Sequence, residues 1–264
     1  MQMITSLHNG KVKYVMDLNR KARFRRDEKV YLVEGPKMVG EIAKEELVSV
    51  FVSEHYCSEC NRRNEPIPFE KEAEIVSDPV FEQMSDTQSP QGVLAVVKQK
   101  DYTLEQILGE ESRTPLLMIL ENLQDPGNLG TILRTAEGAG VTGVIMNRGC
   151  VDIYNSKVIR ATMGAMFRVP FVYVDDLTPV MTELKNRGIC TYAAHLAAEQ
   201  SYDRADFTAP SAFLIGNESK GLSEQLTMQA EVKIIIPMLG KVESLNAAIA
   251  ASILGFEAAR QRRQ

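Results

Sequence analysis

Apolar runs alternate with helical patterns through residues 115–264, and this alternation constrains the fold more than any other feature of the sequence. The run PLLMILE (115–121) is apolar on both faces of an extended chain up to its last residue, which is typical of a strand that helices cover on both sides. Further strands are predicted at 143–146, 170–174, 190–194, 212–216 and 233–237, with helices between them and a long final helix over 244–261. This order predicts an α/β fold whose mostly parallel sheet carries helices on both faces.

The first hundred residues differ in character and are predicted to form a smaller α/β domain of their own. A helical pattern lies around 12–18, and further helices are expected from Pro36 to about residue 45 and over 78–84. Strands are predicted at 31–35, 48–52 and 92–99. The polar stretch 101–114 has few positions that require burial, so it is predicted to be a linker between domains 1–100 and 115–264.

Composition limits the class of protein. The chain has 264 residues, of which 44% are hydrophobic and 25% charged, as in soluble globular proteins and unlike disordered, collagen or coiled-coil chains. No apolar run approaches the roughly 18–20 residues that a membrane span needs. The N-terminal segment MQMITSLHNGKVKYV lacks the apolar core of a signal peptide. We therefore expect a cytoplasmic protein that does not enter membranes and has reduced thiols.

Charge is distributed unevenly, although the net charge is only −5. Residues 1–29 carry eight basic and three acidic side chains, whereas residues 38–80 carry four basic and ten acidic ones. The basic stretch is compatible with a solvated helix and equally with a surface that follows the phosphates of a nucleic acid. The candidate RNA-binding residues in it are Lys11, Arg20, Lys21, Arg23, Arg25 and Arg26.

The cysteines do not suggest a metal centre. Cys57 and Cys60 form a CxxC pair close to His55, but no second pair of ligands follows to complete a zinc site. Cys150 and Cys190 stand alone near predicted strand ends and are expected to be packing residues. We therefore expect no metal, and the sequence leaves the role of Cys57 and Cys60 open.

Three polar loops follow predicted strands, where parallel α/β sheets place their ligands. The loop 121–134 contains Asn128, which is expected to cap the following helix, and Arg134 in that helix's second turn. The loop 216–222 places Glu218 between two glycines, and the loop 237–246 opens the last helix with Ser244 as its expected N-cap. Each loop alone could equally be an ordinary capped helix or tight turn. The G-x-G-x-x-G pattern of dinucleotide-binding enzymes is absent.

Taken together, the three loops resemble the SpoU (TrmH-like) family of SPOUT-class RNA methyltransferases. The segments that carry the resemblance are NLGTILRTA (128–136), IGNESKGL (215–222) and IPMLGKVESLN (236–246). One departure is Ala247-Ala248, where the family usually has Val-Ser, which changes helix packing but no polar role. The N-terminal block NGKVKYVMDLNRKARFRRDEKVYLVEG resembles the L30e-like substrate-binding domain that often precedes this catalytic domain.

The resemblance implies a fold, a cofactor and a partner. It implies a trefoil knot in the C-terminal part, which is an exception to the rule against knotted chains. It implies a homodimer whose active site uses residues from both copies, with no metal. It also implies that S-adenosylmethionine (SAM) binds in the knot largely through backbone groups, at Ala194, Leu196, Gly216, Ile236, Pro237, Met238 and Leu245.

The implied reaction is methyl transfer from SAM to a ribose 2′-hydroxyl of RNA, with Arg134 acting at the hydroxyl. Arginine keeps its proton in proteins, so a safer role is to bind the adjacent phosphate and stabilise the developing alkoxide, with water or phosphate accepting the proton. Asn128 is expected to orient Arg134, and Glu218 to pair with Arg134 or hold its motif together. Ser244 and Asn246 are expected to fix the ribose and the third loop.

Ribosomal RNA is the expected substrate, because an L30e-like domain is more usual in enzymes that modify it. Transfer RNA is the nearest alternative. A catalytically silent RNA-binding or ribosome-assembly protein is a third interpretation, although all three motifs are complete. A dinucleotide-dependent enzyme lacks its glycine signature here.

Overall fold

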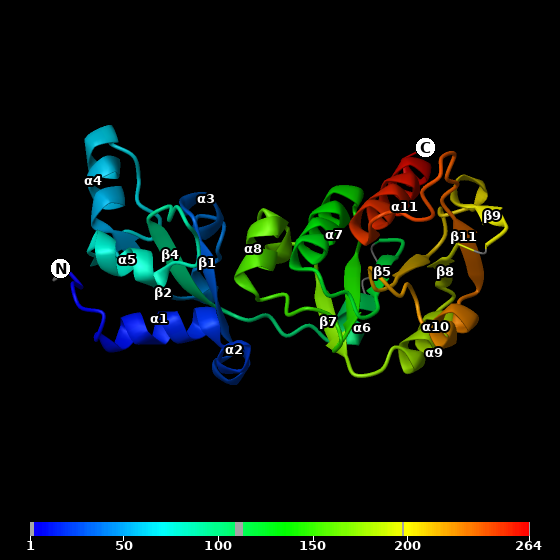
Figure 1. Ribbon diagram of the computed structural model, residues 1–264, viewed down its shortest axis with the longest axis horizontal. Coiled ribbons are helices and arrows are strands. Elements are labelled where there is room, and N and C mark those ends of the chain that lie inside the picture. The colour runs from blue at the N-terminus through cyan, green and yellow to red at the C-terminus, as the bar shows by residue number, and fades with distance from the viewer. Residues whose placement is uncertain (1–2, 109–112, 197, 264) are drawn as a thin grey trace. The chain divides into compact units, whose positions relative to one another are not determined.

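The structure is a computed structural model, and it describes residues 3–108, 113–196 and 198–263. The chain divides into two compact units, which Figure 1 draws. Unit 1 comprises residues 1–100 and 154–167, and unit 2 comprises residues 101–153 and 168–264.

Unit 1 is built on a four-stranded sheet with the order β1-β4-β2-β3. β4 is antiparallel to both β1 and β2, and β3 is parallel to β2. Its strands are β1 (Val30–Glu34), β2 (Leu47–Ser53), β3 (Ala73–Val76) and β4 (Val93–Lys98). Its helices before the inserted segment are α1 (Gly10–Arg20), α2 (Ala22–Glu28), α3 (Pro36–Val39), η1 (Lys44–Glu46), α4 (Glu54–Arg63) and α5 (Asp78–Met84).

The core of unit 1 lies between this sheet and helices α1 and α5. Val12, Val15 and Leu18 recur at helical spacing on α1 and are fully buried, as the apolar face of an amphipathic helix must be. They pack with Phe81 and Met84 of α5 and with alternate residues of the strands. The helix predicted from Pro36 to residue 45 is shorter in the structure, where α3 ends at Val39. Helix α4, which carries Cys57 and Cys60, was not predicted, because its sequence is mainly polar.

Residues 154–167 belong to unit 1 although they lie within the predicted C-terminal domain in sequence. The Tyr154 ring lies 4.7 Å from that of Tyr31 in β1, and the Tyr154 hydroxyl hydrogen-bonds to the backbone of Lys100. The Ser156 hydroxyl donates to Asp86. The segment contains α8 (Ser156–Thr162) and η2 (Ala165–Phe167). Sequence periodicity gives the type of these elements but not the unit that buries them.

Unit 2 is built on a seven-stranded sheet with the order β7-β6-β5-β10-β8-β11-β9, and every pair of neighbours is parallel. This confirms the predicted α/β class with a parallel sheet. The strands are β5 (Leu116–Leu120), β6 (Gly143–Asn147), β7 (Phe171–Val174), β8 (Cys190–Ala194), β9 (Gln200–Ser201), β10 (Ser211–Ile215) and β11 (Val232–Ile235). The helical elements are α6 (Leu104–Leu108), α7 (Pro126–Ala139), α9 (Thr178–Asn186), η3 (Tyr202–Arg204), α10 (Glu224–Gln229) and α11 (Ala247–Arg262).

Helices cover both faces of this sheet. α7 and α11 lie side by side on one face (Figure 1), joined by a 2.7 Å hydrogen bond between the Thr135 and Ser252 hydroxyls. α6, α9 and α10 pack on the other face against Leu117 and Ile119 of β5. All five residues of β5 are buried, which explains its uninterrupted apolar sequence. In the predicted linker, α6 places buried Ile107 and Leu108 in this core, whereas residues 109–112 lie outside the described residues.

Candidate cofactor cavity and active site

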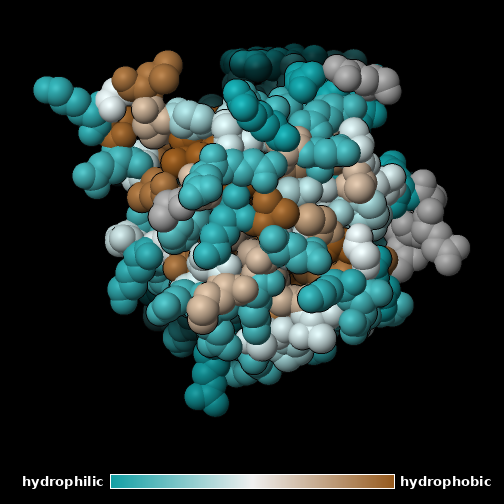
Figure 2. All heavy atoms as spheres, turned by 90° about the vertical axis from the view of Figure 1, so that its right-hand side faces the viewer, coloured by the Kyte–Doolittle hydropathy of each residue, from teal (hydrophilic) through white to brown (hydrophobic). Residues whose placement is uncertain are grey.

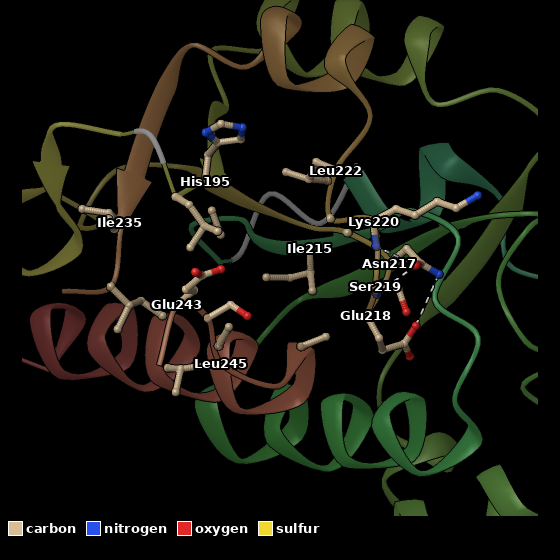
Figure 3. Close-up of a pocket in the computed structure, with 18 of the residues that line it drawn as sticks. His195, Ile215, Asn217, Glu218, Ser219, Lys220, Leu222, Ile235, Glu243 and Leu245 are labelled. Atoms are coloured by element: carbon tan, nitrogen blue, oxygen red, sulfur yellow. Dashed lines mark hydrogen bonds between the residues drawn. The ribbon is translucent and has the colours of Figure 1, made fainter. Parts of the chain in front are cut away.

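A cavity of about 410 Å³ lies where strands β8, β10 and β11 end. The loops after these strands meet there because the carboxyl ends of parallel strands share one edge of the sheet. Figure 3 shows the lining side chains, which are mainly aliphatic. The lining residues include Ile215, Leu222, Ile234, Ile235, Leu245, Ala247 and Ala250. An apolar cavity with a few polar groups at its edge is the usual form of a small-molecule site.

Most of the predicted cofactor residues line this cavity. Six of them do so: Ala194, Leu196, Gly216, Ile236, Met238 and Leu245. Pro237 is not among the lining residues and is exposed. It stands between two lining residues in an irregular segment, so its neighbours take the inward positions. The cavity thus joins residues from three separate parts of the sequence.

Gly216 closes one side of the cavity by a backbone contact that no other residue permits. A Cβ atom at this position would lie 2.2 Å from the carbonyl carbon of Gly221 and 2.2 Å from the nitrogen of Leu222. The turn between them is closed by backbone hydrogen bonds of 3.0 and 2.9 Å between Asn217 and Gly221. Gly221 has φ +69°, a conformation that glycine adopts without strain. The backbone of this turn therefore requires glycine at position 216 and favours it at position 221, the two positions that bracket Glu218.

Glu218 is held by four donors from two loops. Its Oε1 accepts hydrogen bonds from the Asp125 backbone nitrogen (2.9 Å) and from Asn128 Nδ2 (3.0 Å). Its Oε2 accepts from the Gln124 backbone nitrogen (3.2 Å) and from Asn217 Nδ2 (3.4 Å). Burial raises the pKa of Glu218, but the hydrogen bonds from Asn128, Asp125 and Gln124 outweigh it and leave the pKa below its ordinary value. Glu218 is therefore ionised at neutral pH and ties the first two motifs together.

Asn128 and Asn246 extend this cluster to the third motif, through a 2.9 Å hydrogen bond from Asn246 Nδ2 to Asn128 Oδ1. The expected helix caps were wrong by a few residues. Asp125 caps α7 and accepts a hydrogen bond from the Asn128 nitrogen, because Pro126 takes the first helical position. Asn246, and not Ser244, caps α11 by accepting hydrogen bonds from the nitrogens of Ala248 and Ile249. We call Glu218, Asn128 and Asn246 the polar cluster.

Arg134 and Ser244 lie outside the polar cluster. Ser244 lines the cavity. Arg134 is exposed on α7, and within the described residues its guanidinium has no hydrogen-bond or ion-pair partner. The expected pair between Glu218 and Arg134 is not formed, because Asn128 and backbone amides satisfy the carboxylate instead. An exposed arginine without such a partner is available to an anionic ligand.

Sequence reasoning missed several polar residues of the cavity. His195, Lys220 and Glu243 line it, and His195 and Glu243 are each adjacent in sequence to a predicted site residue. Figure 3 shows the Glu243 carboxylate pointing into the cavity and the Lys220 side chain extending away from it. Nothing in the sequence distinguishes these side chains from exposed loop residues. Only the approach of three separate loops gives them a place in the site.

The basic residues of the N-terminal stretch differ in their availability. Arg25 is buried, and its guanidinium donates to the carbonyls of Leu18 (2.8 Å) and Asn19 (3.3 Å), so it holds α1 and α2 together. The prediction of Arg25 as an RNA-binding residue conflicts with this position. Lys11, Lys21 and Arg23 form exposed ion pairs with Glu74, Asp17 and Asp27. Among the described residues, Arg20 and Arg26 are exposed and have no side-chain partner.

The cysteines are all free. Cys60 is buried in unit 1, and burial raises the pKa of Cys150 to about 11, which leaves its thiol protonated at neutral pH. In the described part of the chain, no group of three or more His, Cys, Asp or Glu side chains could hold a metal ion. None of the described helices has the length and hydrophobicity to span a bilayer.

The fold and the site together define a class: a parallel α/β protein with a small-molecule cavity at its strand ends and a polar cluster beside it. Residues 115–256 match the family described as "SpoU rRNA Methylase family", and residues 9–95 match the "MRM3-like substrate binding domain" family. The chain belongs to the SpoU rRNA methylase family. The resemblance seen in the three motifs is thereby confirmed.

Some relatives match along nearly the whole chain. The "23S rRNA (guanosine(2553)-2'-O)-methyltransferase RlmP" of Bacillus subtilis (strain 168) is 30% identical over 97% of this chain and 98% of its own length. The solved "AdoMet bound rRNA methyltransferase from Sinorhizobium meliloti" is 27% identical, with a TM-score of 0.82 over 98% of this chain and 97% of that one. The "SpoU Methyltransferase AviRb from Streptomyces viridochromogenes in complex with the cofactor AdoMet" is 26% identical, with a TM-score of 0.81 over 97% of this chain and 99% of that one.

Proposed function

We propose that this protein is a SAM-dependent methyltransferase that acts on a ribose 2′-hydroxyl of RNA, with ribosomal RNA as its substrate. The observation that carries the proposal is the meeting of three loops, far apart in sequence, at one cavity with the polar cluster beside it. Membership of the SpoU family supports the reaction, and so does the name of the Bacillus subtilis relative, a 23S rRNA 2′-O-methyltransferase.

The residues of the cavity fit SAM. Aliphatic side chains suit the adenine ring, and the Gly216 backbone closes one side where a Cβ atom would collide. Ala194, Leu196, Gly216, Ile236, Met238 and Leu245 would hold the cofactor, with Pro237 outside the cavity. When bound, SAM supplies an electrophilic methyl group. The remaining task is to align the attacking oxygen, which is a positioning problem.

We assign the handling of the ribose to Arg134 and the polar cluster. The Arg134 guanidinium keeps its proton, so it binds the phosphate beside the target ribose and stabilises the negative charge that develops on the 2′-oxygen. The proton of the hydroxyl passes to water or to a phosphate oxygen. Within one protomer, and among the described residues, the Asn128 side chain has no hydrogen bond to Arg134. Instead, it joins Glu218 to Asn246, and with Ser244 these residues fix the loops around the ribose.

A homodimer completes this site. Ile249 and Phe256 of α11 are 51% and 49% exposed, and Leu239 and Val242 of the third loop are also exposed. Hydrophobic side chains reach the surface among hydrophilic ones in Figure 2. An exposed apolar helix face of this kind favours a second copy. We propose that the dimer brings Arg134 of one protomer to the polar cluster of its partner.

Mixing two inactive variants tests this arrangement. In a mixed dimer of Arg134→Ala and Glu218→Gln protomers, an arginine that acts across the interface leaves one intact site. Because half of the dimers formed at random are mixed, activity should return to about a quarter of the wild-type level. An arginine that acts within its own protomer would restore nothing. Light scattering of the wild type and of Ile249→Asp checks the dimer itself.

Unit 1 is proposed to bind the RNA. The match to the MRM3-like substrate binding domain supports this role. Arg20 and Arg26 are the best candidates, because neither pairs with an acidic side chain within residues 3–108, 113–196 and 198–263, and Lys11, Lys21 and Arg23 are secondary. Because the target RNA is ribosomal, we place the protein in the cytoplasm, which cell fractionation tests.

The substrate class is tested by methyl transfer from labelled SAM to unmodified ribosomal RNA and tRNA transcripts, followed by nucleoside mass spectrometry. We expect a 2′-O-methylated nucleoside from ribosomal RNA. Label on tRNA alone would favour the tRNA alternative. SAM binding without transfer to either transcript or to ribosomal particles would favour an RNA-binding role without catalysis.

A further inference from the structure

Asn147, at the end of β6, forms a reciprocal amide pair with Asn122. The Asn122 backbone nitrogen donates to Asn147 Oδ1 at 2.9 Å, and Asn147 Nδ2 donates to Asn122 Oδ1 at 3.0 Å. Neither residue belongs to the polar cluster or lines the cavity. The pair connects the loop after β6 to the loop after β5, which contains two of the backbone donors to Glu218.

Asn122 needs such a partner because its backbone is unusual. Its φ of +53° lies in the left-handed region, which residues other than glycine rarely adopt. Its carbonyl accepts a 2.8 Å hydrogen bond from Asn217 Nδ2, so the turn at Asn122 also touches the second motif. The next residue, Leu123, exchanges hydrogen bonds with the loop after β6: its nitrogen donates to Cys150 Sγ (3.3 Å), and its carbonyl accepts from the Val151 nitrogen (2.8 Å).

The direction of the chain after Asn122 decides where the donors to Glu218 point. The nitrogens of Gln124 and Asp125 follow this turn directly and both donate to the Glu218 carboxylate. From this geometry we propose that Asn147 is a positioning residue for methyl transfer: through Asn122 it fixes the backbone amides that orient Glu218. The inference rests on the proposed function and extends it to a residue outside the three motifs.

Gly149 provides a second, independent way to disturb the same pair. A Cβ atom on Gly149 would lie 1.9 Å from Asn122 Oδ1. Because Asn147 holds this oxygen, the amide of Asn122 could escape only by breaking the pair. Gly149→Ala should therefore break the hydrogen bond from Asn147 Nδ2 to Asn122 Oδ1 without removing any hydrogen-bonding group, and it leaves the Asn122 nitrogen able to donate to Asn147 Oδ1.

The cofactor cavity should be affected little by either change. Glu218 is one of its lining residues, but its wall at Gly216 is fixed by strand β10 and by the backbone hydrogen bonds between Asn217 and Gly221, none of which involve Asn147. We therefore expect Asn147→Ala and Gly149→Ala to lower kcat about tenfold or more, because small displacements of aligning groups are costly. The Kd for SAM should stay within about threefold, since a positioning residue alters the transition state more than ground-state binding.

Full-length variants are compared by methyl transfer at saturating RNA and SAM, by calorimetric SAM binding and by thermal unfolding. The control is Asp206→Ala, which removes the carboxylate that accepts hydrogen bonds from the Thr208 nitrogen and hydroxyl in the loop before β10, at the opposite edge of the sheet. A general loss of stability would lower kcat in this control as well. In an Asn122→Gly background, which keeps the turn without the amide, Gly149→Ala should cause no further loss.

The outcomes separate the inference from the function on which it rests. Wild-type protein that transfers no methyl group to RNA would overturn the proposed function. Active wild-type protein with an unchanged kcat in both Asn147→Ala and Gly149→Ala would overturn the positioning role alone. A loss of SAM affinity as large as the loss of kcat would also overturn it, because the pair would then act on the cavity.

Discussion

Asn246 has two tasks that substitution can separate, and this gives the sharpest prediction about the polar cluster. Its Oδ1 caps α11, accepting from Ala248 and Ile249, while its Nδ2 donates to Asn128. Aspartate keeps the capping oxygen and loses the donor. Alanine loses both. The two variants should therefore differ in stability and agree in their loss of activity.

The expected magnitudes follow from these contacts. Replacing a capping residue by alanine costs about 1 kcal/mol, which lowers Tm by about 2–4 °C in a protein of this size. Asn246→Asp should lose less Tm than Asn246→Ala, because aspartate caps as well as asparagine and only the hydrogen bond to Asn128 is lost. Losing the hydrogen bond to Asn128 costs about 0.5–1.5 kcal/mol, or roughly two- to tenfold in rate if the transition state bears all of it. The new carboxylate faces Asn128 Oδ1, so we expect the upper end of this range or more.

The assay is single-turnover methyl transfer together with thermal unfolding of each variant. Ser53→Ala is a matched control, because it removes the N-cap of α4 in unit 1 and leaves the polar cluster intact. The Tm of Ser53→Ala should fall, whereas its rate of methyl transfer should change little. Full activity in Asn246→Asp would refute the functional role of the cluster. A fall in Tm equal to that of Asn246→Ala would refute the separation of the two tasks.

Three further predictions concern other parts of the protein. Gly216→Ala should abolish SAM binding in calorimetry, because the new Cβ would lie 2.2 Å from the backbone of Gly221 and Leu222; retained binding would place the cofactor elsewhere. Arg26→Glu should raise KM for RNA several-fold with an unchanged Tm, whereas Arg25→Ala should lower Tm, because it leaves the carbonyls of Leu18 and Asn19 without their donor. The opposite pattern would reverse these roles. Finally, the folded-state pKa of Glu218 lies below its ordinary value of 4.5, so its contribution to stability is fully present above that value and is lost as the pH falls through the folded-state pKa. Urea unfolding of the wild type and of Glu218→Gln should therefore show a stability difference that shrinks as the pH falls from neutral to about 3, and a difference independent of pH would contradict the hydrogen-bonded carboxylate.

The sequence predicted those parts of the molecule that depend on local pattern. The buried strands of unit 2 appear as uninterrupted apolar runs, and the parallel sheet follows from their alternation with helices. The place of the cavity follows from the position of the loops after strands. Six of the seven cofactor residues that the family resemblance implied line it.

Other features depend on contacts across long stretches of sequence, which local pattern does not encode. Arg25 lies among basic neighbours and differs from them only through its burial between α1 and α2. The N-cap of α11 is Asn246 and not the predicted Ser244, because the helix starts later than the apolar pattern suggests. Residues 154–167 pack in unit 1 through Tyr31 and Asp86. The proposed role of Asn147 depends on its hydrogen bonds to Asn122 on a neighbouring loop.

The most direct test of the central claim uses one RNA with two versions of a single nucleotide. The site of transfer is first mapped on a ribosomal RNA transcript, and a matched transcript is then made with a 2′-deoxyribose at that nucleotide alone. We expect methyl transfer to the first transcript and none to the second, because the 2′-hydroxyl is the acceptor. Equal transfer to both transcripts would show that a base receives the methyl group and would refute ribose methylation.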